Sequence, residues 1–257
     1  MLRTLLATTL LGAASPALAD TFAVVHGGFQ TAVAWEPVAD ALRAEGNEVI
    51  LVNLPGRNGE GGDPHALTLG AYRDATLAAM DEADDVVLVG HSFGGFTISA
   101  VAEAAPDRVR KLIFVAAYVP ESGESMQALA ETDEGTKFTG ENFVVAPDYS
   151  TAEVLARDRT LLFANDVEGH RAQAISGALV KEPLPPLAEP ITLTEASFGR
   201  VPKAYVLTLR DNAVSPALQA RMVEQAAAAE VTMIDTGHAP KATAPDDLAR
   251  LLREMAR

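Results

Sequence analysis

The chain has 257 residues, of which 48% are apolar and 21% charged, with a formal net charge of −15 at neutral pH and no cysteine. This length accommodates one large domain with a substantial core, and the composition is that of a globular protein. The negative charge argues against nucleic acid or an anionic membrane as partner, since both attract basic surfaces. The lack of cysteine excludes a cysteine nucleophile, a cysteine-ligated zinc site and an iron–sulfur cluster.

Residues 1–19 have the three parts of a secretory signal peptide. Arg3 supplies a positive charge, and the following apolar run at 5–14 is too short to span a bilayer comfortably. Ala17-Leu18-Ala19 then provides a small-x-small cleavage pattern before Asp20. We expect a mature chain of residues 20–257 that is secreted or periplasmic and not stably inserted in a membrane. A buried N-terminal helix and a membrane anchor are the alternatives.

Beyond Asp20 the sequence alternates strand-like and helix-like segments. Short apolar runs predict six strands, at 22–25, 49–52, 86–89, 112–115, 204–209 and 231–234. Helical patterns lie at 32–44, 67–80, 96–104 and 215–229, and a last helix begins near Pro245. Runs this apolar are typical of parallel strands that helices cover on both faces. The predicted fold class is therefore α/β, with a doubly wound, mainly parallel sheet of about six strands.

The alternation stops between about residues 120 and 202. Short helical patterns at 153–162 and 170–179 are followed by four prolines, which predict irregular structure: Pro183, Pro185, Pro186 and Pro190. A simple surface excursion is one interpretation. We favour an inserted cap over an active site, because excursions of this length in compact domains are usually lids or binding elements.

One short motif indicates nucleophilic chemistry. Gly90-His91-Ser92-Phe93-Gly94 matches G-x-S-x-G, in which a serine is held on a sharp turn between a strand and a helix. The motif alone arises often by chance. Here an apolar strand precedes it and a helix follows, so we predict that Ser92 is a nucleophile rather than part of a structural turn.

A serine hydroxyl needs a base to accept its proton. His238 follows the last predicted strand, at the carboxyl edge of the sheet where the turn at Ser92 also opens, so we predict that it is this base. His91 lies inside the turn and points away, His26 is expected to brace the first loop, and His65 and His170 are expected at the surface.

The base in turn needs a carboxylate to orient it. Asp211 follows the strand at 204–209, and the chain order Ser92, Asp211, His238 suits this type of sheet. Asp235, three residues before the histidine, and Glu121, after the fourth strand, are the alternatives. We favour Asp211.

Acyl transfer also needs backbone donors for the oxyanion that forms on attack. We predict that one is the amide of Phe93, directly after the nucleophile. The other is expected from Gly28, in the His26-Gly27-Gly28-Phe29 loop after the first strand. A plain tight turn is the alternative interpretation of those glycines.

Taken together, these residues resemble the α/β-hydrolase superfamily over essentially the whole mature chain. Within it, the chain is similar to the branch of plant methyl esterases, hydroxynitrile lyases and bacterial esterase-like proteins. The residues that carry this resemblance are Val25 to Phe29, Trp35, Gly90 to Gly95, Leu162 to Asp166, Leu207 to Asp211, Gln219 and Gly237 to Pro240.

The resemblance also distinguishes ester hydrolysis from the other reactions of these relatives. The hydroxynitrile lyases of this branch carry a threonine at the position of Gly27 and a lysine at that of Ala239, so both departures argue against cyanohydrin cleavage. The serine at position 92 also differs from the aspartate nucleophile of haloalkane dehalogenases and epoxide hydrolases.

We therefore predict a serine esterase that cleaves a small carboxylic ester through an acyl-enzyme, without cofactor or metal. Apolar candidates for its substrate pocket are Phe29, Tyr118, Leu129 and Phe163. A carbon–carbon lyase and a non-enzymatic ligand-binding protein on the same fold are the alternatives. The sequence carries no prediction of the natural ester, the oligomeric state or the pH optimum.

Overall fold

The computed structural model describes residues 19–57, 61–226 and 228–257. The predicted signal peptide therefore lies, except for Ala19, outside the described residues. None of the helices in these ranges is long and apolar enough to cross a membrane.

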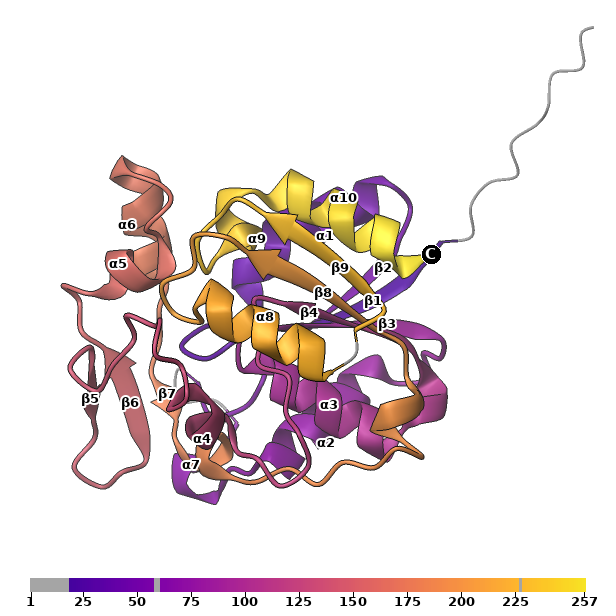
Figure 1. The fold of residues 1–257 in the computed structure, drawn as a ribbon, viewed down its shortest axis with the longest axis horizontal. Helices are drawn as coiled ribbons and strands as arrows, with labels where there is room; N and C mark the ends of the chain where they lie inside the picture. The colour runs from indigo at the N-terminus through magenta and orange to yellow at the C-terminus, as the bar shows by residue number, and fades with distance from the viewer. Residues whose placement is uncertain (1–18, 58–60, 227) are drawn as a thin grey trace, which may run out of the picture.

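A six-stranded sheet forms the centre of the fold (Figure 1). Its order is β2-β1-β3-β4-β8-β9, and every neighbouring pair is parallel. The strands are β1 (Thr21–Val25), β2 (Glu48–Val52), β3 (Val86–His91), β4 (Val109–Val115), β8 (Lys203–Thr208) and β9 (Glu230–Ile234). The predicted doubly wound sheet is confirmed. The strand order reverses between β1 and β3, and ligands bind outside the carboxyl ends of parallel strands at such a switch point.

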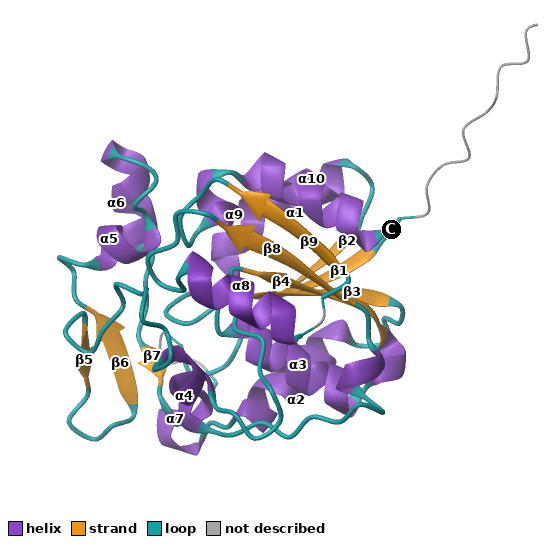
Figure 2. Ribbon diagram, viewed as in Figure 1, coloured by secondary structure: helices purple, strands orange, loops and turns teal. Residues whose placement is uncertain are grey.

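Helices cover both faces of this sheet (Figure 2). On one face lie α1 (Glu36–Ala44) and α10 (Pro245–Ala256), which pack Leu42 and Leu252 into a buried cluster with Phe22 of β1. On the other face lie α2 (Leu69–Met80), α3 (Gly94–Ala104) and α8 (Pro216–Gln225), around a larger buried cluster. The core thus holds the central strands on both sides, which explains their uninterrupted apolar sequence.

Shorter elements complete the helical layers. They are α9 (Pro240–Thr243) and the 3₁₀ turns at Ala32–Trp35, Pro64–Ala66 and Pro106–Arg108; a further 3₁₀ turn, at Phe198–Arg200, precedes β8.

Residues 120–202, which we call the cap, lie mostly beside the carboxyl ends of the strands (Figure 2). The last part, residues 189–202, is the return segment, which runs along α2 and α3 to the start of β8. The cap contains α4 (Met126–Ala130), β5 (Phe143–Val145), β6 (Thr151–Val154), α5 (Arg159–Phe163), α6 (Gly169–Gly177), β7 (Glu182–Pro183) and α7 (Pro185–Ala188). Its strands form a separate antiparallel sheet of order β5-β6-β7. A small apolar cluster joins cap residues such as Val154 and Phe163 to Phe29, in the loop after β1.

Two sequence expectations for the cap are wrong. The helix expected at 153–162 is instead the end of β6 followed by α5, because β6 pairs with strands on both sides and this pairing outweighs local helical preference. Three of the four prolines expected to prevent regular structure lie within β7 and α7, whereas Pro190 lies in a segment without helix or strand, as expected. Pro183 lies in an edge strand, and Pro185 and Pro186 occupy the first turn of α7, where their missing N–H groups have no partner to lose.

Gly95 of α3 packs so closely against the segment after β4 that one added methyl group should destabilise the protein. A Cβ at Gly95 would overlap the backbone carbonyl oxygen of Tyr118, whereas a Cβ at Gly177 would meet nothing within 4 Å. We expect Gly95→Ala to lower the free energy of unfolding by at least about 2 kcal/mol, because the backbone must move to admit the methyl group. Gly177→Ala is the matched control and should change it by less than about 0.5 kcal/mol. Urea denaturation measures both, and equal effects would contradict the packing described.

Candidate active site

The turn after β3 holds Ser92 in a left-handed backbone conformation, with φ of 53°. This conformation is strained for any residue with a Cβ and persists only where the surroundings enforce it. Here two glycines allow the chain to pack closely enough around Ser92 to hold it in this conformation. A Cβ at Gly90 would lie 2.8 Å from the Gly94 carbonyl oxygen, and one at Gly94 would lie 2.6 Å from that of Val25. The chain thus turns sharply from β3 into α3 and leaves the Ser92 side chain partly exposed.

The loop after β1 lies directly against this turn. A Cβ at Gly27 would come within 2.7 Å of the Ser92 Cβ, so only glycine fits there. His26 fixes the loop from behind: its Nε2 accepts the Leu54 N–H at 3.2 Å, which leaves the ring proton on Nδ1, 2.9 Å from the Gly27 carbonyl oxygen. Burial lowers the pKa of His26 well below its usual value, so this brace is neutral.

His238 and Asp211 form a buried pair at the carboxyl ends of β8 and β9. His238 Nδ1 lies 2.8 Å from Asp211 Oδ2. If Nδ1 carries the ring proton toward the carboxylate, Nε2 is left without a proton and can accept one. His238 is 1% exposed and Asp211 4%, so bulk water competes little with this contact.

The rest of the Asp211 carboxylate is held by four donors. Oδ1 accepts the backbone N–H groups of Ala213 (2.8 Å) and Val214 (2.9 Å). Oδ2 accepts the Thr208 hydroxyl (2.9 Å) and the Gln219 side-chain amide (3.2 Å). An ionised carboxylate only accepts hydrogen bonds, so a shell made of donors suits it. Gln219, which carries part of the family resemblance, acts by orienting Asp211.

The other acidic and histidine candidates lie elsewhere. Asp235 is exposed and pairs with Arg210 at 2.8 Å, and Glu121 is exposed in the cap. His65 and His170 are also exposed. Among these alternatives, Asp211 is the carboxylate that the structure places against His238.

Ser92, His238, Gly28 and Phe93 line one small cavity, of about 40 Å³. The predicted pocket residues Phe29, Tyr118 and Phe163 also line it, together with residues not predicted from the sequence: Met126, Phe138, Leu187, Ala213 and Val214. Leu129, the fourth predicted pocket residue, is not among the residues that line this cavity. It lies one turn beyond Met126 in α4 and belongs to the larger buried cluster. The wall of the cavity is thus almost entirely apolar.

Three aromatic rings of this wall interlock. Phe29, Phe138 and Phe163 contact one another edge to face, with centroid distances from 5.7 to 6.4 Å. Phe163 also meets the His238 ring at 5.5 Å. The cap therefore contributes Phe163, which contacts the histidine ring, and Phe138, which packs against Phe163. No strand or helix pattern marked Phe138, which lies in an irregular segment.

Gly28 and Phe93, the two predicted oxyanion donors, both line this cavity. Among the described residues, neither the Gly28 nor the Phe93 amide donates a hydrogen bond. Ser92 Oγ and His238 also form no direct hydrogen bond in the described part of the chain, and such contacts often tighten only when substrate binds.

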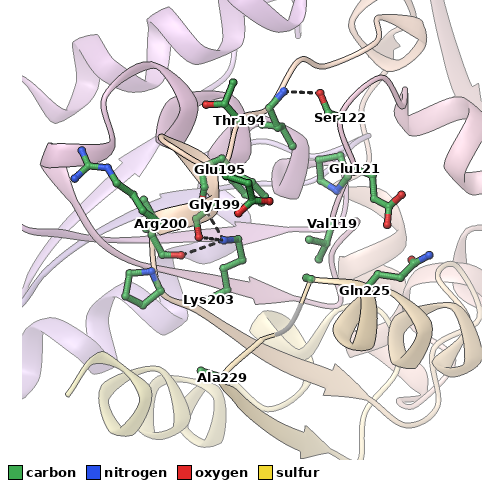
Figure 3. Close-up of a pocket in the computed structure, with 16 residues that line it drawn as sticks. Val119, Glu121, Ser122, Thr194, Glu195, Gly199, Arg200, Lys203, Gln225 and Ala229 are labelled. Atoms are coloured by element: carbon green, nitrogen blue, oxygen red, sulfur yellow. Dashed lines mark hydrogen bonds between the residues drawn. The ribbon is translucent and has the colours of Figure 1, made fainter.

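A larger cavity, of about 520 Å³, opens between the cap's return segment and the end of α8 (Figure 3). Its most buried charge, Lys203, donates to the carbonyl oxygens of Phe198 (2.9 Å) and Val201 (3.1 Å). None of its described lining residues is a histidine, and the predicted nucleophile Ser92 lines the smaller cavity. Nor do the described residues contain a group of three or more histidine, aspartate or glutamate side chains arranged to hold a metal ion.

Behind His238 lies a buried cation that the sequence did not mark. Lys241, 1% exposed, places Nζ 3.5 Å from His91 Nε2 and over the Trp35 ring. His91 Nε2 also contacts the His238 carbonyl oxygen at 2.7 Å, so His91 supports the loop that carries His238. Burial lowers the pKa of Lys241 to about 7, although the charge of Asp211 opposes this shift.

Comparison with known proteins gives one family. The model of the Alpha/beta hydrolase family matches residues 22–251. Methylesterase 2 of Arabidopsis thaliana is 27% identical over 255 residues, which cover 91% of this chain and 95% of the relative. Putative methylesterase 11, chloroplastic, from the same plant is 28% identical over 251 residues, covering 92% of this chain but only 64% of that relative.

Solved structures share the fold. A pyrethroid hydrolase from Sphingobium faniae JZ-2 superposes with a TM-score of 0.82 at 21% identity, covering 93% of this chain and 97% of that one. The resemblance to plant methyl esterases drawn from the motifs is confirmed by these relatives.

The buried lysine predicts a specific pH dependence of stability. An unfolded lysine binds its proton below about pH 10.5, whereas Lys241 in the fold binds it only below about 7. Between these values the unfolded state holds more protons, so Lys241 increasingly disfavours folding as the pH falls. We expect Lys241→Met to stabilise the protein most near pH 7, and this gain to shrink by about 1.4 kcal/mol per pH unit toward pH 10. Denaturant unfolding of both proteins from pH 7 to 10 measures it; a gain independent of pH would contradict the buried charge.

Proposed function

The chain belongs to the alpha/beta hydrolase family, and from this premise we propose that it is a serine esterase acting through an acyl-enzyme. The observation that carries the proposal is the His238–Asp211 contact at 2.8 Å, in the wall of the cavity that Ser92 also lines. A nucleophile, a base and a carboxylate that orients the base are the groups that acyl transfer requires.

In the proposed mechanism, His238 Nε2 accepts the Ser92 proton as Oγ attacks the ester carbonyl. The negative charge that forms on the carbonyl oxygen accepts hydrogen bonds from the Gly28 and Phe93 amides, which donate to no other group among the described residues. His238 then returns the proton to the departing alcohol, and Asp211 stabilises the imidazolium in between. Water, activated by His238, releases the acid from Ser92 by the same steps in reverse.

The cavity supports a small ester with an apolar acyl group as substrate. Its wall is made of Phe29, Phe138, Phe163 and other apolar side chains, and its free volume is about 40 Å³. Binding of anything larger requires the cap side chains to move apart. The relatives' designation as methylesterases supports a methyl ester, whose leaving group is the smallest possible alcohol.

A carbon–carbon lyase is the less favoured reaction. The close approach of Gly27 to Ser92 excludes a side chain on the first loop at that position, and so excludes the hydroxyl that a threonine would add there. Ester hydrolysis needs no such hydroxyl.

Replacement of the nucleophile is the first test. Ser92→Ala should abolish labelling by a fluorophosphonate probe and reduce hydrolysis of a short-chain nitrophenyl ester by about 10⁴-fold or more, since the covalent step is lost. Gel fluorescence and an absorbance assay measure the two effects. Retention of both by a folded Ser92→Ala variant would eliminate the proposal.

The two aspartates near His238 form a matched pair for the second test. Asp211→Asn should lower kcat by about 10⁴-fold, because the amide favours the wrong imidazole tautomer. Asp235→Asn alters an exposed side chain that pairs with Arg210, and should change kcat less than about threefold. Steady-state kinetics separate them, and a larger loss at position 235 would transfer the role to Asp235.

A further inference from the structure

A buried ion pair links the cap to the segment after β2. Arg57 Nη2 lies 2.5 Å from Glu182 Oε1, and the two residues are 2% and 0% exposed. Arg57 follows β2, whereas Glu182 lies in β7 of the cap. Buried pairs of this kind are expensive to desolvate and are weak evidence for a contribution to stability alone. A contribution to stability alone therefore does not explain the Arg57–Glu182 pair.

The second carboxylate oxygen of Glu182 binds the loop after β1. Glu182 Oε2 accepts the backbone N–H of Phe29 at 2.8 Å. The Phe29 carbonyl oxygen in turn accepts the N–H of Val180 at 2.9 Å, so the cap segment 180–182 holds both polar groups of one peptide residue. Phe29 needs this support, because its φ of 60° is left-handed and strained for a residue with a side chain.

The residue held in this way directly follows Gly28. The Glu182 carboxylate lies near Gly28 as well: a Cβ at Gly28 would be 3.8 Å from Oε2. Since Phe29 donates its N–H to Glu182, that group is not available to a substrate. Gly28 lines the cavity, and its N–H donates no hydrogen bond to any of the described residues. The contact therefore gives the two neighbouring amides different roles: the Phe29 N–H binds Glu182 of the cap, and the Gly28 N–H is left for the oxyanion.

Without a counter-charge, the Glu182 carboxylate beside Gly28 would destabilise a negatively charged oxyanion at the site. Burial raises the pKa of Glu182, while the Arg57 guanidinium and the Phe29 amide favour the ionised form. Arg57 also donates to the Pro55 carbonyl oxygen (3.1 Å) and the Tyr72 hydroxyl (3.3 Å), so its position is set by the main domain. Its positive charge balances that of Glu182 beside the site.

We infer that Glu182 and Arg57 are positioning residues for the oxyanion donor: Glu182 of the cap fixes the Phe29 amide so that the Gly28 amide faces Ser92, and Arg57 neutralises Glu182. The inference rests on the proposed function, and it makes the cap part of the catalytic machinery rather than only a cover. Displacement of the segment 180–182 would release the loop and misdirect the Gly28 N–H.

Two charge-neutral double variants test the inference. Arg57→Met/Glu182→Met removes the pair and leaves the Phe29 N–H without an acceptor, whereas Arg57→Gln/Glu182→Gln retains an amide oxygen for it. We expect the methionine pair to lower kcat by about 10- to 10²-fold, below the cost of losing an oxyanion donor outright, with KM within about threefold of wild type. The glutamine pair should keep at least about fivefold more activity than the methionine pair.

A trifluoromethyl ketone distinguishes a positioning role from loss of stability. Its adduct with Ser92 places an oxyanion among the donors, so its inhibition constant should weaken in the methionine pair by the same factor as kcat. Glu103→Gln is the control: Glu103 accepts the Thr194 N–H at 2.8 Å and holds the cap's return segment, away from the loop after β1. Equal inhibition constants in the methionine pair, the Glu103→Gln variant and wild type would overturn the inference.

Hydrogen exchange of the wild-type protein tests the same contact without substitution. The Phe29 amide should exchange slowly and the Gly28 amide fast, and the ketone should slow exchange at Gly28. Equal, fast exchange at both would overturn the inference, even if no double variant folds. Ser92→Ala separates the two proposals: if it still hydrolyses ester, the proposed function fails, whereas exchange at Phe29 reports on the Glu182 contact alone.

Discussion

The close approach between the loop after β1 and the turn after β3 is the constraint on which the site depends. These two segments meet because β1 and β3 are neighbours in the sheet, on either side of the point where the strand order reverses. Glycine is required on both sides: a Cβ at Gly27 would meet Ser92, and one at Gly94 would meet the Val25 carbonyl oxygen. The approach places the Gly28 and Phe93 amides in the wall of one cavity.

Buried hydrogen bonds from other parts of the structure hold these segments in place. His26 braces the first loop from β2, and the Glu182–Arg57 pair holds it from the cap. The histidine loop is supported separately, by His91 beneath and by Asp211 at its side. Each support is buried, so the hydrogen bonds operate with little competition from water. A strained serine and a strained phenylalanine can persist only within such a framework.

Much of this could be predicted from the sequence, because the signals were local. Uninterrupted apolar runs predicted all six strands of the sheet, and the motif around Ser92 predicted its sharp turn. The order of elements predicted that Asp211 and His238 would meet, and the structure places them 2.8 Å apart. Their catalytic roles remain predictions until variants are assayed.

What the sequence did not reveal depends on contacts between distant segments. The helix predicted at 153–162 takes in the end of β6, one of whose partners, β7, lies about 30 positions further along the chain. Phe138 reaches the cavity from a segment with no periodicity. Glu182 contacts Arg57 across 125 positions of sequence, so neither residue stands out from an ordinary surface charge. Lys241 likewise resembles a solvated lysine until the fold buries it beside Trp35.

The most direct measurement of the central claim is a crystal structure of the protein after reaction with a fluorophosphonate. The account predicts phosphorus bonded to Ser92 Oγ, and its phosphoryl oxygen about 2.7–3.1 Å from both the Gly28 and Phe93 amide nitrogens, as an oxyanion would be. Phosphorus on another residue, or a phosphoryl oxygen directed away from both amides, would contradict it.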